Sequence, residues 1–259
     1  MVPVERTNRG GFARFPSNVI PCTSRPYPGH PVVTFPTGRE VTGVVPRDPR
    51  LTIPAMSLQP VTLAGEAVRL EPLSRDHLPG LLEVGLDPDL WRITVQFGGT
   101  PEALAAYVDE ALRQQAAGTA LPFALVEPAT GRIMGSSRFG NYDAPSARIE
   151  IGWTWVARPW QRTRVNTEAK YLLLRHAFDA LGLERVELRT DAINARSRAA
   201  IRRIGAVEEG ILRRQQRTWD GRLRDTVLHS ILREEWPAAR ARLEAMLAGT
   251  GAAPASRDA

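Results

Sequence analysis

The sequence predicts an α/β (α+β) domain built around a mixed β-sheet. Two observations lead to this fold class. Segments with strand character follow one another through short turn-like connections, which favours antiparallel neighbours. One long helical segment joins two strand-like segments, and such a strand–helix–strand unit places its two strands parallel in one sheet. The chain has 259 residues, 43% of them hydrophobic, and a chain of this length can bury a stable hydrophobic core without disulfides.

From about residue 63 onward the sequence shows the hydrophobic patterns of strands and helices, and we call this part the patterned region. Residues 67–70 have strand character, and Ser74 is a suitable cap for a helix through about residue 84. Thr100-Pro101-Glu102 predicts a helix start, because a cap residue, a proline and an early acid follow one another. Two strands are expected at 123–126 and 133–136, joined by a turn at 127–131.

The second half contains the elements that matter most for function. A strand is expected at 148–156, then an irregular loop at 158–166 and a helix at 167–181 closed by Gly182. A strand at 186–190 and a helix at 194–204 follow. The last elements are a hairpin of 210–218 and 226–232 around Asp220-Gly221 and a helix at about 237–247.

Residues 1–55 differ from the rest of the chain. They contain ten Pro and five Gly without a helical or strand period, so we expect them to be disordered. Met56 directly precedes the patterned region. Either residues 1–55 form a genuine flexible tail, or the reading frame is over-extended and translation starts at Met56.

Composition narrows the class of protein. Cys22 is the only cysteine and cannot form an internal disulfide, which fits a reducing cytoplasm. No apolar run approaches the ~20 residues of a membrane span, and the start lacks the apolar stretch of a signal peptide. We therefore expect a cytoplasmic protein without a membrane partner.

The positive charge of the chain is unevenly distributed. The net charge is +6, but residues 1–55 hold seven Arg against three acidic residues. In the rest of the chain acids are mixed among the bases, whereas a nucleic-acid-binding domain would carry its basic excess on the folded part. We expect no nucleic-acid partner.

Several chemistries are excluded by missing motifs. Neither G-x-G-x-x-G after a strand nor G-x-x-x-x-G-K-S/T occurs, and the four histidines lack metal-ligand spacing, so no metal is expected. The strand–loop–helix at 148–182 remains. Exposed amides at a helix N-terminus bind anions such as pyrophosphate, and Arg162 and Arg164 add charge. Basic residues near helix starts are common, however, so this pattern alone leaves an ordinary surface loop equally open.

Three further stretches carry a resemblance to a known family. They are Glu150-Ile151-Gly152-Trp153, residues 160–169 with Thr167-Glu168-Ala169, and Asn194-Ala195-Arg196-Ser197 followed by Gly205-Ala206 and Glu209-Gly210. Their order and spacing resemble the GNAT superfamily of acetyl-CoA-dependent N-acetyltransferases, closest to its RimJ/RimL-like branch. The resemblance covers residues 67–236. It implies the GNAT acyl-CoA N-acyltransferase fold, a mixed, mostly antiparallel sheet with helices on both faces. It also implies an N-acetyltransferase domain at 56–236. The residue pattern itself predicts a C-terminal helix and a flexible tail at 237–259.

The resemblance also implies where acetyl-CoA binds. Backbone amides near Trp155 and Val156 would hold the thioester oxygen and the pantetheine arm, and Asn194 and Ser197 would contact that arm from the next helix. The loop at the helix start would bind the pyrophosphate through Gln161, Arg162, Thr163, Arg164, Val165, Asn166 and Thr167. Asn194 is also suited to be a helix cap, which does not exclude a contact with the arm, and the alternative for Ser197 is a surface residue.

Two departures from the family pattern stand out. The family loop reads Q/R-x-x-G-x-G/A, but Arg164 and Asn166 replace its small residues. Arg164 either exchanges a close backbone contact for a charged one or weakens binding, since glycine lets a backbone approach phosphate closely. Ile201 occupies the position where many members carry a tyrosine, so another group or water would protonate the leaving thiolate, and Ser197 is the best donor available.

Glu150 is the candidate general base. A protein α-amine is roughly 10% neutral at pH 7 and a lysine amine well under ~0.1%, so a modest base suffices for an N-terminal amine. Strand alternation places Glu150, Gly152 and Thr154 on one face and Ile149, Ile151, Trp153 and Trp155 on the core face. The alternative is that Glu150 has no catalytic role and is a surface or salt-bridged glutamate.

The amine acceptor is the least defined part of the prediction. A protein N-terminus is favoured, a small-molecule amine such as an antibiotic is the alternative, and a non-catalytic acyl-CoA-binding domain is the third option. We expect the loops around residues 91–99 to select the acceptor. The oligomeric state stays open, a dimer included.

Overall fold

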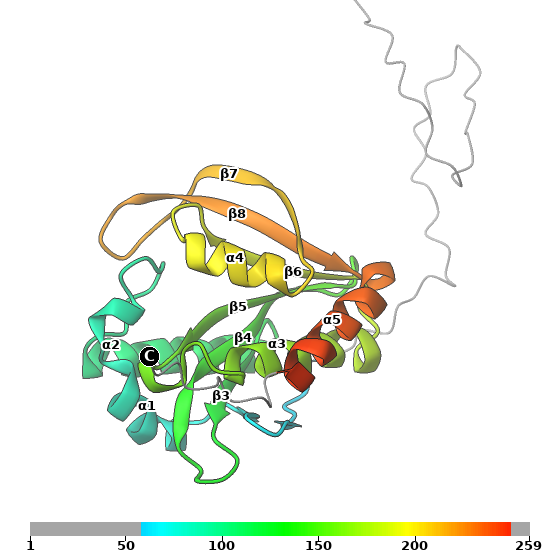
Figure 1. Cartoon of the computed structure of the whole chain (residues 1–259). Coiled ribbons are helices and arrows are strands. Elements are labelled where there is room, and N and C mark those ends of the chain that lie inside the picture. The colour runs from blue at the N-terminus through cyan, green and yellow to red at the C-terminus, as the bar shows by residue number, and fades with distance from the viewer. Residues whose placement is uncertain (1–57, 250–259) are drawn as a thin grey trace, which may run out of the picture. The chain divides into compact units, whose positions relative to one another are not determined.

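A computed structural model describes residues 58–249 (Figure 1). The predictions for residues 1–55, for Met56 and for the C-terminal tail beyond 249 lie outside the described residues. Of the predicted elements, the strand over 148–156 is reproduced without change, and the other strands and helices agree within a few residues at most ends.

Eight strands form one sheet in the order β1-β2-β3-β4-β5-β6-β8-β7. All neighbouring pairs are antiparallel except β5 and β6, which confirms the mixed, mostly antiparallel sheet. The strands are β1 Leu63–Ala64, β2 Arg69–Pro72, β3 Leu121–Val126, β4 Ile133–Asp143, β5 Arg148–Val156, β6 Arg185–Asp191, β7 Val207–Arg217 and β8 Leu223–Leu232.

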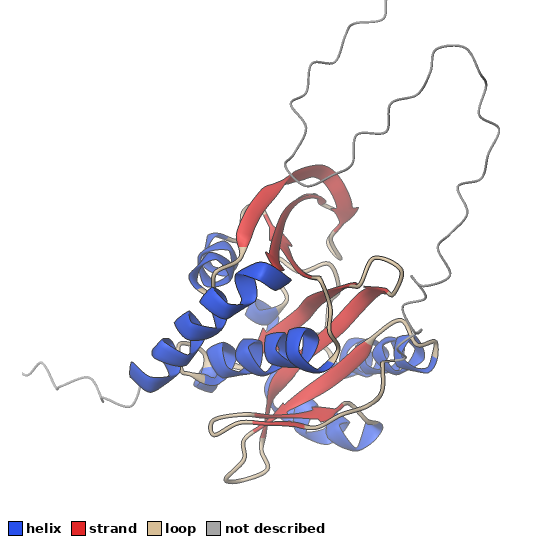
Figure 2. Ribbon diagram, turned by 90° about the vertical axis from the view of Figure 1, so that its right-hand side faces the viewer, coloured by secondary structure: helices blue, strands red, loops and turns tan. Residues whose placement is uncertain are grey.

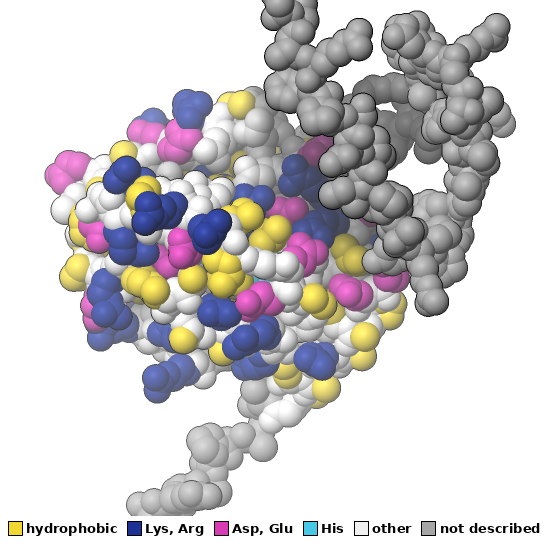
Figure 3. Space-filling model, turned by 90° about the horizontal axis from the view of Figure 1, so that it is seen from above, with side chains coloured by type: hydrophobic (Ala, Val, Ile, Leu, Met, Phe, Trp, Pro, Cys, Tyr) yellow, Lys and Arg dark blue, Asp and Glu magenta, His cyan; other side chains and the backbone are white. Residues whose placement is uncertain are grey.

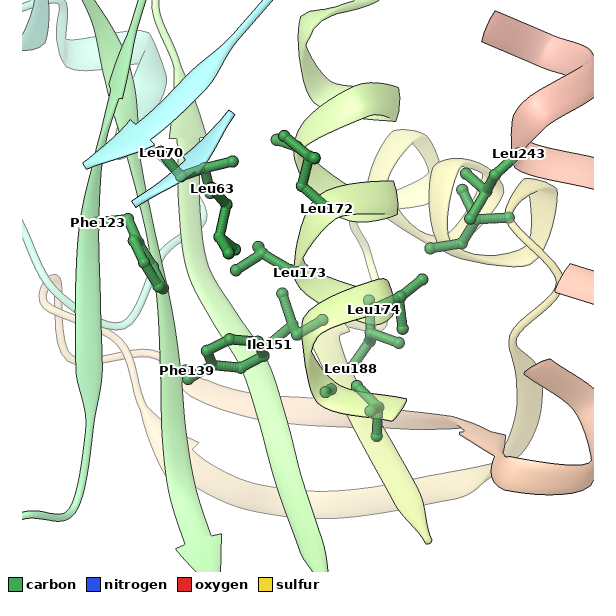
Figure 4. Packing of buried hydrophobic residues seen from close by; sticks show 14 of the residues in the cluster. Leu63, Leu70, Phe123, Phe139, Ile151, Leu172, Leu173, Leu174, Leu188 and Leu243 are labelled. Carbon is green, nitrogen blue, oxygen red and sulfur yellow. The ribbon is translucent and has the colours of Figure 1, made fainter. Parts of the chain in front are cut away.

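Helices cover both faces of the sheet (Figure 2). They are α1 Leu78–Gly85, α2 Pro101–Ala116, α3 Val165–Arg175, α4 Ala195–Arg203 and α5 Trp236–Gly249. On one face, α3 packs its leucines between the sheet and α5, so that Leu173 contacts the layer of Phe139 and Ile151 while Leu243 of α5 lies on the far side (Figure 4). On the other face, α1 and α2 bury a second cluster around Trp91 and Trp155.

The helix that follows β5 starts earlier than its sequence pattern predicts. α3 begins at Val165 rather than Thr167, because Thr163 already serves as the turn residue that accepts from the Val165 amide at 3.3 Å. The regular helix ends at Arg175 and continues as a π-helical turn, His176–Ala180, before Gly182 adopts a φ of +62°.

The predicted alternation of β5 is wrong beyond Gly152. Ser136 pairs with Trp155 and Arg138 with Gly152, so β5 holds one extra residue, and Trp153 has a φ of +50°. Such a β-bulge reverses the faces that follow it. Ile149 and Ile151 therefore lie in the α3-side core, whereas Trp155 lies in the cluster under α2.

The parallel pairing of β5 and β6 is short. It joins Arg148, Ile149 and Glu150 to Arg185, Val186 and Glu187, and within residues 58–249 no further pair links the two strands. From Ile151 to Val156 the edge of β5 is thus left without a strand partner on the β6 side. This opening, with Glu150 at its closed end, positions the candidate site.

Candidate functional site

The loop before α3 presents a group of free backbone amides. Arg162 has a φ of +63°, a left-handed turn, and the hydroxyl of Thr163 donates to the carbonyl oxygen of Trp160 at 2.7 Å. The amides of Arg162, Thr163, Arg164 and Asn166 donate to no group within residues 58–249. Unpaired amides at the positive end of a helix dipole form a site for an anion.

Gln161 ties this loop to β5 and to α4. Its Nε2 donates to the carbonyl oxygen of Val156 at 2.7 Å, and its Oε1 accepts from Nη1 of Arg196 at 3.0 Å. A second tie joins α4 to α3, where Arg203 donates to the hydroxyl of the buried Thr167 at 2.9 Å. The loop, the end of β5 and the start of α4 therefore meet around one opening.

Asn194 is the N-cap of α4, one of the two roles that the sequence predicts for it. Its Oδ1 accepts from the backbone amide of Ser197 at 3.0 Å. The Ser197 hydroxyl is half-buried and makes no hydrogen bond to any described residue, so it is free to act as a donor. The cap fixes this hydroxyl at the first turn of α4.

The guanidinium of Arg164 is paired with carboxylates of the same chain. Its Nη2 donates to Oε2 of Glu66 at 2.9 Å and lies 3.8 Å from Oε1 of Glu168. The guanidinium charge is therefore matched by carboxylates of this chain. The geometry does not support the expectation that Arg164 replaces the glycine contact by a charged one.

Glu168 has a structural position that the sequence does not show. The carboxylate is buried and accepts from the backbone amides of Glu66, Ala67 and Val68, at 3.1, 2.6 and 2.9 Å. The acid of the Thr167-Glu168-Ala169 motif thus holds the segment before β2 onto α3. Val165 is buried in the same helix start, while Asn166 is half-buried.

The side chains of Trp155 and Val156 are not available to a ligand. The Trp155 ring is 6% exposed and packs 5.4 Å from the ring of Trp91. Val156 belongs to the core on the other face. Of their backbone carbonyls, that of Trp155 lies against Gly135 of β4, whereas that of Val156 accepts from Gln161.

Glu150 is a buried carboxylate at the closed end of this gap. Its side chain is 9% exposed; Oε2 accepts from Nδ2 of Asn141 at 2.7 Å and lies 3.3 Å from Nε of Arg189. Burial raises the pKa of Glu150 above its usual value, against the opposing effects of Arg189 and Asn141. A carboxylate with a raised pKa is a better proton acceptor near neutral pH.

The pKa of the neighbouring carboxylate, Glu187, is shifted in the opposite direction. It pairs across the strands with Glu150, and burial alone would raise its pKa. Hydrogen bonds from Arg189, at 2.9 Å, and Arg185, at 3.0 Å, outweigh burial and hold the pKa of Glu187 below its usual value. Of these two adjacent acids, Glu150 is the one suited to accept a proton.

Lys170 is a residue that the sequence analysis missed. It is the only lysine of the chain, lies on α3 and is 8% exposed. Its Nζ donates to Oγ1 of Thr154 at 2.8 Å. Burial lowers the pKa of Lys170 to about 7, although the charge of Glu150 acts in the opposite direction. A lone lysine within an otherwise apolar stretch of helix was the available signal.

An aromatic contact joins two segments that are distant in the sequence. The indole of Trp219, in the turn between β7 and β8, donates to the carbonyl oxygen of Trp91 at 2.8 Å and lies 4.6 Å from the ring of Phe97. The loop at 91–99 therefore lies beside the β7–β8 turn. The sequence predicted a role for the loop at 91–99 but not for Trp219.

A hollow of about 480 Å³ adjoins Glu150. Asn141 and Arg189, both partners of Glu150, line it together with Arg148 and the turn at 142–145. Seen from above, the surface shows basic and acidic side chains interspersed with apolar ones (Figure 3). Within the part of the chain described, no cluster of side chains suited to a metal ion is found, and no helix is long and apolar enough to cross a membrane.

Comparison with known proteins gives a consistent result. The model of the family described as acetyltransferase (GNAT) domain matches residues 67–207. The Bacillus subtilis protein named "Putative ribosomal N-acetyltransferase YdaF" is 34% identical over 106 residues, which are 41% of this chain and 57% of that protein. The match thus spans less than two thirds of this curated relative.

Solved structures match over more of the chain. A putative acetyltransferase from T. thermophilus is 39% identical with a TM-score of 0.67, covering 74% of this chain and 100% of that one. Mycobacterium smegmatis RimJ, solved in complex with CoA-disulfide, is 26% identical with a TM-score of 0.62, covering 72% of this chain and 95% of that one.

Proposed function

Because this chain belongs to the acetyltransferase (GNAT) domain family, we propose that it transfers the acetyl group of acetyl-CoA to a protein N-terminal α-amine, with Glu150 as general base. One observation carries this assignment. Glu150 is a buried carboxylate whose pKa is raised by burial, and it lies where β5 and β6 separate. An incoming amine can lose its proton there.

Acetyl-CoA would bind along the opening between β5 and α4. The unpaired amides of Arg162, Thr163, Arg164 and Asn166 are suited to its pyrophosphate. The free edge of β5 near Trp155 and Val156 would pair with the pantetheine arm, and the start of α4 at Asn194 would contact it from the other side. The remaining loop residues, Gln161, Val165 and Thr167, hold these amides in place through their packing and hydrogen bonds.

The transfer itself follows from the groups around the opening. Glu150 takes a proton from the acceptor ammonium, and the neutral nitrogen attacks the thioester carbon. Backbone amides of β5 stabilise the negative oxygen of the tetrahedral intermediate. Collapse breaks the carbon–sulfur bond, and the CoA thiolate takes a proton from the Ser197 hydroxyl or from water. The second proton, which the nitrogen loses as the amide forms, restores that hydroxyl or water.

The acceptor is proposed on chemical grounds and on the relatives' names. The Bacillus subtilis relative YdaF is named as a putative ribosomal N-acetyltransferase, and the Mycobacterium smegmatis structure is that of RimJ. An α-amine needs only a modest base, as Glu150 provides. A small-molecule amine is the second candidate, because one fold serves many acceptors. A non-catalytic acyl-CoA binder is less favoured, because binding needs only the loop amides, whereas the chain also holds a buried base, Glu150, whose pKa is raised by burial.

We further propose a cytoplasmic location without a nucleic-acid or membrane partner. The support is the single cysteine and the mixed charges of the patterned region.

Two measurements, made one after the other, test the proposed function. Acetyl-CoA should raise the melting temperature of the full chain, and CoA thiol release should then be followed with N-terminal peptides and small-molecule amines. Acetylation of peptide α-amines supports the proposal. If only small amines are acetylated, the acceptor is a small-molecule amine and not a protein N-terminus. Stabilisation without any turnover would favour a non-catalytic binder. The absence of both stabilisation and turnover would overturn the assignment.

A further inference from the structure

Arg224 is a buried arginine without a partner. It lies on β8 and is 8% exposed, and its guanidinium makes no hydrogen bond or ion pair with any residue from 58 to 249. Its Nε is fully enclosed. By contrast, Arg222 donates to Asp191 at 2.5 Å and Arg189 to Glu187 at 2.9 Å, so the arginines around it have carboxylate partners.

Another buried arginine shows how this chain holds a guanidinium for structural purposes. Arg138 is 1% exposed, donates to Oε1 of Gln114 at 3.0 Å and lies about 5 Å from the rings of Tyr107 and Trp153. Arg224 has neither a hydrogen-bond acceptor nor an aromatic ring beside it among the described residues. A packing role of the kind seen at Arg138 therefore does not account for it.

The position of Arg224 connects it to the proposed acceptor side. Sheet pairing aligns Glu150 with Glu187, Asp191 with Thr226 and Arg224 with Gln216. Side chains at positions two apart on β8 share a face, so Arg224 lies on the same sheet face as Thr226, Asp191 and Glu150. The charge of Arg224 acts on Glu150 and that of Glu150 acts on Arg224, although the two do not touch.

An unpaired buried charge is unfavourable unless a binding partner supplies the counter-charge. Removing a guanidinium from water is penalised, and a neutral carbonyl group compensates this only in part. A carboxylate matches the guanidinium both in charge and in its two-oxygen geometry. The CoA phosphates are not suitable candidates, because the free amides for them lie on the loop before α3.

We propose that Arg224 binds a carboxylate of the acceptor, so that the preferred substrates are N-termini with Asp or Glu at the first or second residue. The inference rests on the proposed function, because the amine must lie at Glu150 for a nearby carboxylate to reach Arg224. It narrows the acceptor from any α-amine to one with an acidic group close by.

Matched peptides test this selectivity in the full chain. The kcat/KM for acetylation is compared between Ser-Asp and Ser-Asn peptides, and between Asp- and Asn-initiated peptides, that are otherwise identical. The wild type should prefer the acidic member of at least one pair by about 10- to 100-fold, the discrimination expected from a charge-assisted hydrogen bond. Arg224→Gln should abolish the preference, whereas Arg213→Gln, at an exposed arginine of β7, should keep it.

Stability without an acceptor provides a readout that does not depend on turnover. Arg224→Leu should leave the melting temperature unchanged or raise it, because the leucine removes a buried charge without a partner. A large decrease would reveal a structural role and overturn the proposal. Equal rates on acidic and neutral peptides would overturn it while the proposed function stands. If no peptide is acetylated although acetyl-CoA binds, the proposed function fails and this substrate class fails with it.

Discussion

Replacing Lys170 by methionine should stabilise the protein. Lys170 is buried on α3, and its single hydrogen bond goes to Thr154. Burial lowers its pKa from 10.5 to about 7, so the charged form is disfavoured in the folded state. Methionine has a similar length and carries no charge, so the Lys170→Met variant removes the penalty and loses one hydrogen bond.

The size and pH dependence follow from this difference in pKa. At about 1.4 kcal/mol per unit, the interval from 10.5 to about 7 corresponds to about 5 kcal/mol. The lost hydrogen bond offsets about 1 kcal/mol, so the gain at or below neutral pH is at most about 4 kcal/mol. Between these two pKa values the unfolded chain binds more protons, so the stability of the wild type rises with pH in that window and is flat below it.

Urea unfolding at several pH values measures both effects. The wild type should gain stability from pH 7 toward pH 9.5, and Lys170→Met should lack this gain. Arg175→Met, on the same helix, is the matched control and should keep the pH dependence of the wild type. If Lys170→Met is less stable than the wild type at pH 7, Lys170 is charged and paired, and the reasoning from burial is refuted.

Two predictions concern the loop before α3, which is proposed to bind acetyl-CoA. Arg164→Ala should leave the acetyl-CoA dissociation constant within about threefold of wild type, because the guanidinium pairs with Glu66 and such partly exposed ion pairs contribute little to stability. If calorimetry shows binding weakened by more than about tenfold, Arg164 contacts a phosphate of acetyl-CoA and this reasoning is wrong. Gln161→Ala should weaken binding by about 1–3 kcal/mol, because it breaks the ties to Val156 and Arg196; an unchanged constant would mean that the loop holds its shape without Gln161.

Elements with local signals could be predicted from the sequence. The Thr100 hydroxyl does accept from the Ala103 amide at the start of α2, and the strand at 148–156 has the bounds its pattern indicates. The cap at Asn194 is predictable for the same reason. Caps and turns depend on neighbours within a few residues, which a single sequence displays.

Features that depend on partners far along the chain could not be predicted. The bulge at Trp153 exists because β5 holds one residue more than β4 offers, so the predicted alternation fails only after that point. Glu168 belongs to the motif that opens α3, yet its carboxylate binds amides about a hundred positions away. The burial of Lys170 and Arg224 likewise depends on packing between elements, not on local pattern.

The most direct test of the account is the steady-state acetylation rate of an N-terminal peptide by the wild type and Glu150→Gln across pH. Glutamine keeps the shape and a hydrogen-bonding group but cannot accept the proton. We predict a turnover number lower by about 10²–10⁴ at pH 7, with much of the loss recovered toward the amine pKa, and an acetyl-CoA dissociation constant within about threefold of wild type. Wild-type turnover by Glu150→Gln at pH 7 would contradict the account and leave amine deprotonation to water.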